Sequence, residues 1–188
     1  MAYDSAISEQ SFSLRGQLLI ASPSLADGTF DHSVIILSKH TATDGAVGAI
    51  INHRTDSTVG ELLCGPQFKA LRKLPIHHGG PLAKDELTFC SFSWSETDGL
   101  RYRTGISAEA AAKLVGMPGQ VVRACIGHSA WSPGQLENEL TQNTWITLKP
   151  SSNLLYQAHD ITLWATLLKE ISPYHHLLSQ APQNPFLN

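Results

Sequence analysis

Short runs of branched apolar residues, each bounded by Pro, Gly, Asp or Asn, constrain the fold of this chain more than any other feature. Runs of this length with turn residues on both sides are typical of buried strands. They dominate the first two-thirds of the chain, so the sequence predicts a β-rich fold. The runs are Leu18–Ala21, Val34–Leu37, Val47–Ile51, Leu74–His78, Leu87–Phe92, Leu100–Thr104, Val121–Ile126 and Thr144–Leu148.

Two helices are indicated by their capping residues. Thr58-Val59-Gly60-Glu61 fits a capping box, in which the threonine oxygen accepts from the amide three residues on and the glutamate reaches back. Ser107 precedes the alanine-rich run 108–114, which has high intrinsic helix propensity and is closed by Gly116. This second helix is the clearest in the sequence.

Two more helices are expected in the last third. Ser132-Pro133-Gly134-Gln135 resembles another capping box, with Pro133 at the first helical position. The last helix is expected from about Asp160 to Ile171, stopped by Pro173. Its apolar residues at helical spacing are Ile161, Trp164, Leu168 and Ile171.

The order of these elements favours an α+β fold. Strands follow one another before helices begin to alternate, and the sequence shows no repeating βαβ unit and no linker. We therefore expect a single domain over residues 14–178 with a mixed sheet. Residues 1–13 are expected to form a flexible leader, because they lack the basic start and apolar run of a secretory signal. Residues 179–188, which contain two prolines, are expected to form an extended tail.

Composition excludes some classes of protein. The 188 residues are 42% hydrophobic and 15% charged, with a net charge of −3, which fits a globular chain with little general attraction for nucleic acid. A local basic patch could still assemble from Arg101, Arg103 and Arg123. No apolar run approaches the roughly 20 residues of a membrane helix, so a soluble cytoplasmic protein is expected.

The three cysteines predict no redox or metal chemistry. Cys64, Cys90 and Cys125 are an odd number, widely separated and without a Cys-x-x-Cys pair. Cys90 and Cys125 lie in apolar strand-like runs, where a buried thiol is inert, whereas Cys64 precedes a Gly-Pro turn and is expected to be more exposed. A catalytic cysteine is not expected.

Glycines and histidines offer one candidate anion site. Gly79 and Gly80 follow a pair of histidines, and successive glycines can present amides to an anion, although a tight turn is the simpler interpretation. The nine histidines show no metal-binding spacing. A metal site from His53, His78 and His128 would need tertiary convergence, so no metal and no cofactor are predicted.

No complete catalytic motif is present. His128-Ser129 is the best local base and nucleophile pair, but adjacent residues rarely face each other and the second glycine of a nucleophile elbow is missing. Glu137 and Glu139 lie two residues apart and therefore face different sides of a helix, where Glu139 is expected to pair with Gln135.

Trp131 leaves two interpretations open. A large aromatic residue in a loop before a helix either closes the core or forms the wall of a pocket, and the core is the simpler choice. The helix start that follows it would also attract an anionic ligand.

Four segments together resemble the AlgH/YqgE family in order and spacing, over about residues 18–145. They are Phe30-x-x-Ser33-Val34-Ile35, Gly45-Ala46-Val47-Gly48-Ala49-Ile50-Ile51-Asn52, Gly79-Gly80-Pro81-Leu82, and Trp131-Ser132-Pro133-Gly134-Gln135-Leu136-Glu137-x-Glu139 followed by Trp145. The resemblance implies an α+β fold with a mixed, barrel-like sheet flanked by helices, and a bacterial cytoplasmic protein. The activity of the family is largely uncharacterised. The family's label of transcriptional regulator rests on a genetic association with alginate production.

This chain departs from the family pattern near the candidate site. Gly127-His128-Ser129-Ala130-Trp131 stands where the family usually has Gly-Tyr-Ala-Gly-Trp. His53 and Arg54 follow Asn52, where the family often has Arg or Lys and then Pro.

Two hypotheses about function remain. The first is a non-enzymatic regulatory or interaction protein that recognises a protein or small-molecule partner. The second is a small-ligand or anion-binding protein, or a hydrolase-type enzyme. Both hypotheses use the loops around Asn52, Gly79-Gly80 and His128, the first as a recognition surface and the second as a pocket. Direct DNA binding is a weaker third possibility and predicts a continuous basic stripe near a helix. The candidate ligand-binding residues are Asn52, Gly79, Gly80, His128 and Trp131.

Overall fold

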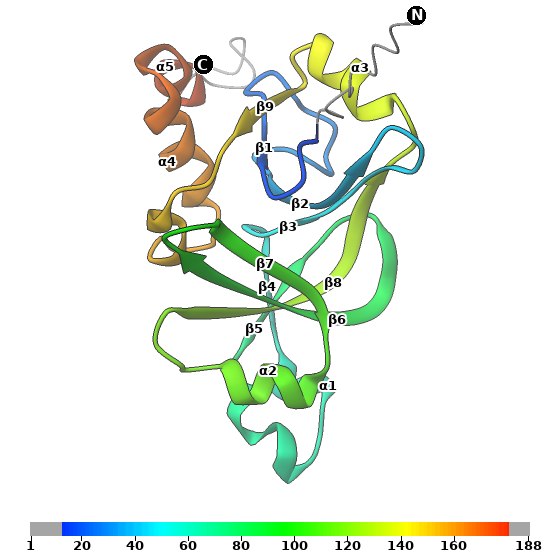
Figure 1. The fold of residues 1–188 in the computed structure, drawn as a ribbon, viewed down its shortest axis with the longest axis vertical. Coiled ribbons are helices and arrows are strands. Elements are labelled where there is room, and N and C mark those ends of the chain that lie inside the picture. The colour runs from blue at the N-terminus through cyan, green and yellow to red at the C-terminus, as the bar shows by residue number, and fades with distance from the viewer. Residues whose placement is uncertain (1–12, 181–188) are drawn as a thin grey trace, which may run out of the picture.

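A mixed sheet curled into a half-barrel, with helices on its flanks, forms a single α+β domain (Figure 1). The structure, a computed structural model, describes residues 13–180. Within this range nine strands form one sheet in the order β4-β5-β8-β3-β2-β1-β9, and β6 joins it by pairing with β8 and with β7. The pairing of β5 with β8 is parallel, and the other pairings are antiparallel. The fold class expected from the sequence is confirmed.

The strands match the apolar runs of the sequence, with one addition. β4 was not expected, because its sequence Arg-Thr-Asp-Ser-Thr is polar. It lies at the end of the sheet, paired only with β5, where polar side chains face solvent. The strands are β1 (Leu18–Ala21), β2 (Val34–Thr41), β3 (Gly45–Ile50), β4 (Arg54–Thr58), β5 (Pro75–His78), β6 (Leu82–Ser95), β7 (Gly99–Ile106), β8 (Gln120–Trp131) and β9 (Trp145–Leu148).

The capping residues place two helices correctly. Thr58 and Glu61 form the predicted capping box of α1, and the Ser107 hydroxyl accepts from the Ala110 amide at the start of α2, 3.2 Å away. The helices are α1 (Val59–Leu62), α2 (Ala108–Leu114), α3 (Gln135–Thr141), α4 (Thr162–Ile171) and α5 (Pro173–Gln180), with 3-10 turns at η1 (Pro66–Leu71) and η2 (Ser152–Leu155).

The start of α3 was predicted two residues too early. Gly134 is its N-cap and takes a left-handed conformation, with φ of 78°, so that Pro133 lies before the helix. One of the two hydrogen bonds of the expected capping box is present, because the Gln135 side-chain oxygen accepts from the Ser132 amide at 3.0 Å. Because Gly134 turns the chain in this left-handed conformation, α3 begins at Gln135 and not at Pro133.

The C-terminal region also differs from expectation. Pro173 ends α4 as predicted, but it also begins α5, since proline is well accommodated in the first turn of a helix. Ser179 and Gln180 belong to this helix, so the extended segment does not begin at Ser179. The rest of the expected tail, 181–188, and most of the expected leader, 1–12, lie outside the described residues.

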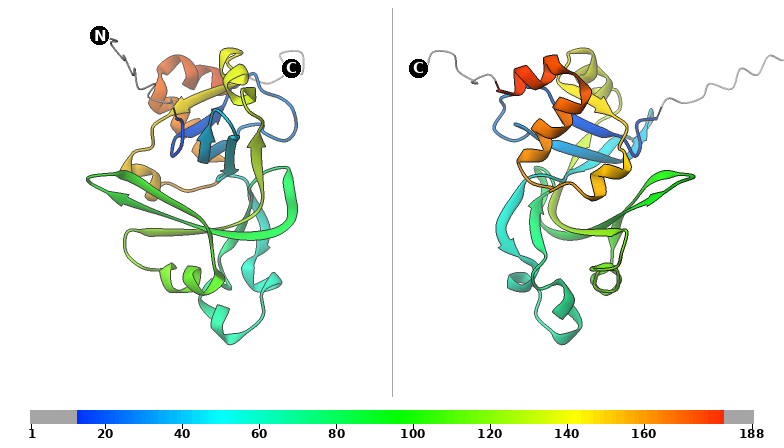
Figure 2. Two further views of the ribbon diagram at one scale, coloured as in Figure 1. Left: turned by 45° about the vertical axis from the view of Figure 1, so that its right-hand side comes forward. Right: turned by 90° about the vertical axis from the view of Figure 1, so that its left-hand side faces the viewer.

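The long strand β8 connects the two halves of the molecule. Its first part pairs with β5 and β6 over one core cluster, which α1, η1 and α2 cover, and its last part pairs with β3 in the other half. Figure 2 shows the two halves and the β6–β7 hairpin, which projects as an arm from the sheet. The region where β8 passes from one half to the other positions the candidate site.

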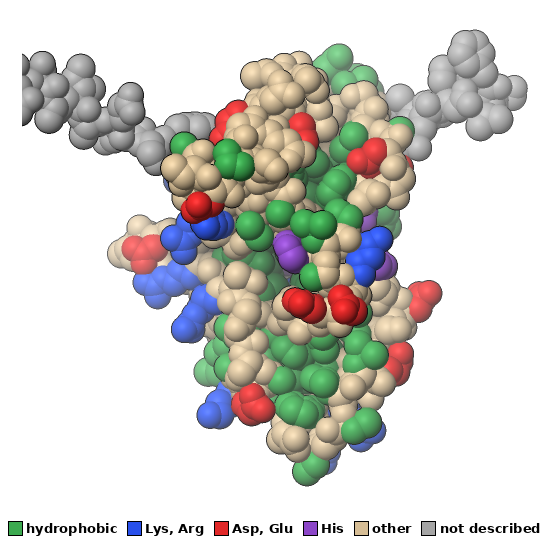
Figure 3. Space-filling view, turned by 90° about the vertical axis from the view of Figure 1, so that its right-hand side faces the viewer, with side chains coloured by type: hydrophobic (Ala, Val, Ile, Leu, Met, Phe, Trp, Pro, Cys, Tyr) green, Lys and Arg blue, Asp and Glu red, His purple; other side chains and the backbone are tan. Residues whose placement is uncertain are grey.

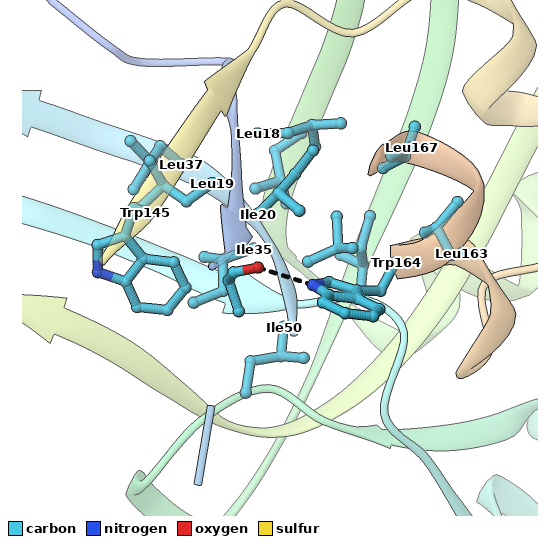
Figure 4. Packing of buried hydrophobic residues seen from close by; sticks show 14 of the residues in the cluster. Leu18, Leu19, Ile20, Ile35, Leu37, Ile50, Trp145, Leu163, Trp164 and Leu167 are labelled. Atoms are coloured by element: carbon cyan, nitrogen blue, oxygen red, sulfur yellow. Dashed lines mark hydrogen bonds between the residues drawn. The ribbon is translucent and has the colours of Figure 1, made fainter. Parts of the chain in front are cut away.

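The larger core cluster packs α4 against the end strands of the sheet. Trp164 and Leu168 are buried there as expected, together with Leu163 and Leu167, whereas Ile161 is 61% exposed because it precedes the helix. The Trp164 indole donates a hydrogen bond to the carbonyl oxygen of Ala21, 2.7 Å away, which ties α4 to β1 (Figure 4).

Candidate functional site

The double glycine is a close crossing of two backbone segments. A Cβ at Gly79 would lie 2.2 Å from the Gly127 carbonyl oxygen, and one at Gly80 would lie 2.3 Å from the His128 carbonyl group. The Gly79 amide donates to the Ile126 carbonyl at 2.8 Å, so it does not point into an anion-binding nest. The glycines therefore let the end of β5 pack directly against β8.

Asn52 is held by the backbone around the start of β2. It is 1% exposed; its side-chain oxygen accepts from the Val34 amide at 2.7 Å, and its side-chain nitrogen donates to the His32 carbonyl at 2.9 Å. These bonds join the residues after β3 to the strand that pairs with it. Ligand binding by Asn52 stays a prediction.

Trp131 is part of the core, as the simpler interpretation predicted, but it is the last residue of β8 and does not lie in a loop, because β8 continues past Ile126 to pair with β3. It is 5% exposed, and its indole donates to Glu139 Oε2 at 2.8 Å. The Trp145 indole donates to the same oxygen at 2.7 Å, while Gln135 donates to the other oxygen at 3.0 Å. The sequence predicted the Gln135 contact but not the two indoles, although Trp131 and Trp145 flank Glu139 along the chain.

His128 lines a cavity of about 200 Å³ at the junction of the two halves. The cavity lies among β2, β3, β6, β7 and β8, and its wall is built largely from small side chains. Trp131 does not line this cavity, so the structure does not bring it together with His128 at the candidate site. The lining residues are Ser38, Val47, Gly48, Ala49, Ala83, Glu86, Thr88, Cys90, Tyr102, Thr104, Cys125, Gly127 and His128.

The Cys90 thiol and the Tyr102 phenol in the cavity wall are neutral. Cys90 and Cys125 are both buried, as expected, and Cys64 is exposed. The hydrogen bond to Cys125, together with burial, raises the pKa of the Cys90 thiol. Burial likewise raises the pKa of the Tyr102 phenol. Because a cysteine nucleophile must be a thiolate, Cys90 is not activated for catalysis.

A wider cleft of about 810 Å³ adjoins this cavity and shares Ser38 and Tyr102 with it. Three arginines line the cleft: Arg101 and Arg103 from β7, and Arg15 from the turn before β1. The sequence proposed a patch of Arg101, Arg103 and Arg123. Arg123 lies apart from it, largely buried on β8, where burial lowers its pKa and its Nη1 donates to the Val122 carbonyl at 3.0 Å.

A third cavity, of about 220 Å³, collects other residues that the sequence singled out. His53, His78, Gly80 and Lys84 line it, but His128 does not, so the three histidines considered for a metal do not converge. Across residues 13–180 no group of three or more His, Cys, Asp or Glu side chains is placed to hold a metal ion.

Two further histidines are buried beneath η2. His77 is 2% exposed and donates through Nε2 to the His159 carbonyl at 3.1 Å, and His159 is 5% exposed and donates to the Leu154 carbonyl at 2.9 Å. Burial, aided by the charge of Arg123, lowers the pKa of His159 to about 4. Burial also lowers the pKa of His77. Both side chains are therefore neutral near pH 7.

Stability is expected to fall as the pH drops from about 6.5 to 4. The unfolded chain takes up a proton on His159 below its ordinary pKa of about 6.5, whereas the folded chain does so only near pH 4. The unfolded state therefore binds more protons in this window, and His159 alone should lower the free energy of unfolding by about 3 kcal/mol. Urea titrations at pH 7, 5 and 4 check this. A His159→Asn variant with the same pH dependence would contradict it.

Comparison with known proteins decides the family. A family profile described as DUF179: AlgH-like matches residues 18–175. The chain belongs to the AlgH-like family. The match extends about 30 residues beyond the segment in which the sequence motifs lie, because it includes η2 and α4.

Several members of the AlgH-like family resemble this chain. A protein of Nitrosomonas eutropha named UPF0301 protein is 34% identical over 160 residues, 79% of this chain and 84% of the relative. A UPF0301 protein of Bacteroides thetaiotaomicron is 29% identical over 181 residues, 93% and 91% of the two chains. These names assign no activity.

Two solved structures show the same fold. Protein DIP2367 of Corynebacterium diphtheriae has a TM-score of 0.69 at 21% identity, covering 92% of this chain and 95% of that one. The AlgH protein of Pseudomonas aeruginosa, a solution structure, has a TM-score of 0.64 at 24% identity, covering 93% and 97%. At these identities the likeness concerns the fold alone.

The structure also bears on the membrane question. Between residues 13 and 180 no helix has the length and apolar character needed to cross a membrane.

Proposed function

We propose that this AlgH-like chain is a non-enzymatic cytoplasmic regulatory protein that binds a small ligand in the cavity lined by His128. The observation that carries the proposal is the cavity itself, which lies where five strands meet and adjoins the arginine-lined cleft. Ligand sites are concave, with a few polar groups among apolar walls. His128 and Glu86 supply polar groups here, and Val47 and Ala49 supply apolar wall.

Small side chains form much of the cavity wall. Ser38, Ala49 and Ala83 contribute only small groups to it. Gly48 and Gly127 also line the cavity, but a Cβ at Gly48 would meet Ile36 and one at Gly127 would meet Gly80, so these glycines serve the close packing of the chain segments. About 200 Å³ corresponds to the liquid volume of roughly seven water molecules, enough for one small group of a ligand.

A binding role is favoured over catalysis by the chemistry of the wall. An enzyme site of the kind considered from the sequence would place His128, Asn52 and an acidic group in one cleft. Asn52 is instead occupied by backbone hydrogen bonds, and Cys90 and Tyr102 are held neutral. The regulatory part of the proposal comes from the family resemblance, with ligand occupancy as the regulated event.

The test is a thermal-shift screen against nucleotides, phosphate esters and sugars, using the wild type and Thr104→Trp. Thr104 is exposed at the cavity wall, so the indole should fill the cavity without disturbing the core. A ligand at 100 times its dissociation constant stabilises by about 2.7 kcal/mol, which raises Tm by roughly 5 °C or more in a domain of this size.

We expect at least one compound to raise the Tm of the wild type and not that of Thr104→Trp. Thr147→Trp is the matched control, because Thr147 is also an exposed strand residue and lies on β9, away from the cavity. A shift that survives in Thr104→Trp, or no shift with any compound, would contradict the proposal.

A further inference from the structure

The cleft beside the cavity carries an excess of positive charge. Its side chains include Arg15, Arg101 and Arg103 and one acidic residue, Asp98, which leaves two positive charges in excess. The chain as a whole has a net charge of −3, so this concentration is local. Lys and Arg side chains also gather along one margin of the face shown in Figure 3, while a histidine lies near its centre among hydrophobic side chains.

The three arginines that line the cleft come from two segments of the chain. Arg101 and Arg103 are two residues apart on β7, so they project from the same face of the strand, about 7 Å apart along it. Arg15 lines the same cleft together with Gly16, and the Gly16 amide donates to the Leu37 carbonyl of β2 at 2.8 Å. The three arginines therefore come to one cleft from two segments that are far apart in the sequence.

Protection of an edge strand explains only part of this arrangement. β7 pairs only with β6, and charged side chains on such an edge discourage pairing with other chains. That function does not require Arg15, which lies outside the strands, nor a cleft that Leu37 and Tyr102 also line. The cleft therefore has features of a binding site that edge protection leaves unexplained.

The charge of Arg101 remains available to a ligand. Asp98 forms an ion pair with Arg101, which lowers the pKa of Asp98. Both side chains are more than half exposed, and exposed pairs of this kind contribute little to stability. An incoming anion with more than one charge can therefore displace Asp98 at small cost.

We propose that the arginine cleft binds the phosphate groups of a phosphorylated small molecule whose uncharged end enters the His128 cavity. The inference rests on the proposed function, since it names the class of its ligand. Arginine suits phosphate because its planar group donates two parallel hydrogen bonds to phosphate oxygens. Ser38 and Tyr102 belong to both spaces, so one molecule can occupy both.

The test is isothermal titration with inorganic pyrophosphate, which has the phosphate groups alone. The wild type should bind it, and Arg101→Gln/Arg103→Gln should weaken binding at least tenfold. Lys69→Gln/Lys113→Gln, which removes the same charge near η1 and α2, should leave it unchanged. Binding by the wild type should weaken as salt rises. No binding, or equal loss in the lysine control, would overturn the proposal.

Thr104→Trp separates this proposal from the proposed function. It should keep pyrophosphate binding, because it fills the cavity and not the cleft. If a screened compound depends on the cavity while pyrophosphate does not bind, the cavity function stands and the cleft proposal fails. If pyrophosphate depends on the arginines but no compound depends on the cavity, the cleft binds phosphate and the cavity function fails. A single-stranded oligothymidylate that binds the cleft more tightly than pyrophosphate would overturn the choice of a small molecule.

Discussion

Gly80→Ala is expected to destabilise the protein by about 4 kcal/mol or more, a large part of the total stability of an ordinary domain. Gly80 has a φ of 150°, which L-residues rarely adopt, and its added Cβ would lie 2.3 Å from the carbonyl carbon and oxygen of His128. Both partners are backbone, so neither can move aside without shifting β5 or β8. Conformational strain and overpacking therefore add.

A control separates the steric clash from the backbone conformation. Gly119 also has a positive φ, of 69°, but nothing lies within 4 Å of a Cβ built there. Gly119→Ala should cost about 1 kcal/mol, from conformation alone. Urea denaturation of both variants measures the difference. Equal losses would mean that the crossing of Gly80 and His128 is not as close as described.

Glu139→Ala is expected to cost about 3–5 kcal/mol, because it removes the acceptor of two indole hydrogen bonds. Trp131 and Trp145 are 5% and 4% exposed and both donate to Glu139 Oε2. Truncation leaves both N–H groups without this partner and opens space beside their edge-to-face contact, in which the ring centroids are 5.9 Å apart.

Glu139→Gln is the matched control, since glutamine retains one acceptor oxygen and nearly the same shape. It should lose clearly less than Glu139→Ala in the free energy of unfolding. Tryptophan fluorescence should report the loss in Glu139→Ala as a shift toward the spectrum of exposed indoles. Full stability in the alanine variant would show that the two indoles do not depend on this carboxylate.

The local parts of the fold could be read from the sequence. Apolar runs located the buried strands, and Thr58 and Ser107 located two helix starts, because these signals depend on neighbours along the chain. β4 was missed because a polar edge strand carries no apolar run. The start of α3 was misplaced because the left-handed conformation of Gly134 fits Ser-Pro-Gly-Gln as well as a capping box does.

The candidate site was only partly predictable for the same reason. Gly79, Gly80 and His128 come together, but the glycines serve a crossing of β5 and β8 that no local pattern reveals. The cavity beside His128 depends on where β2, β3, β6, β7 and β8 meet. Arg15 could not be grouped with Arg101 and Arg103, since these residues are about 86 positions apart in sequence and only the folded arm brings them together.

The central claim, that a small ligand occupies the His128 cavity, is tested most directly by amide chemical shifts. Proton–nitrogen spectra would be recorded with and without the screened compound that raises Tm most. The account predicts that the largest shifts fall on the cavity wall, at Gly48, Gly127 and His128. Largest shifts at the cavity of His53 and His78, or over α4 and α5, with the His128 wall unchanged, would contradict it.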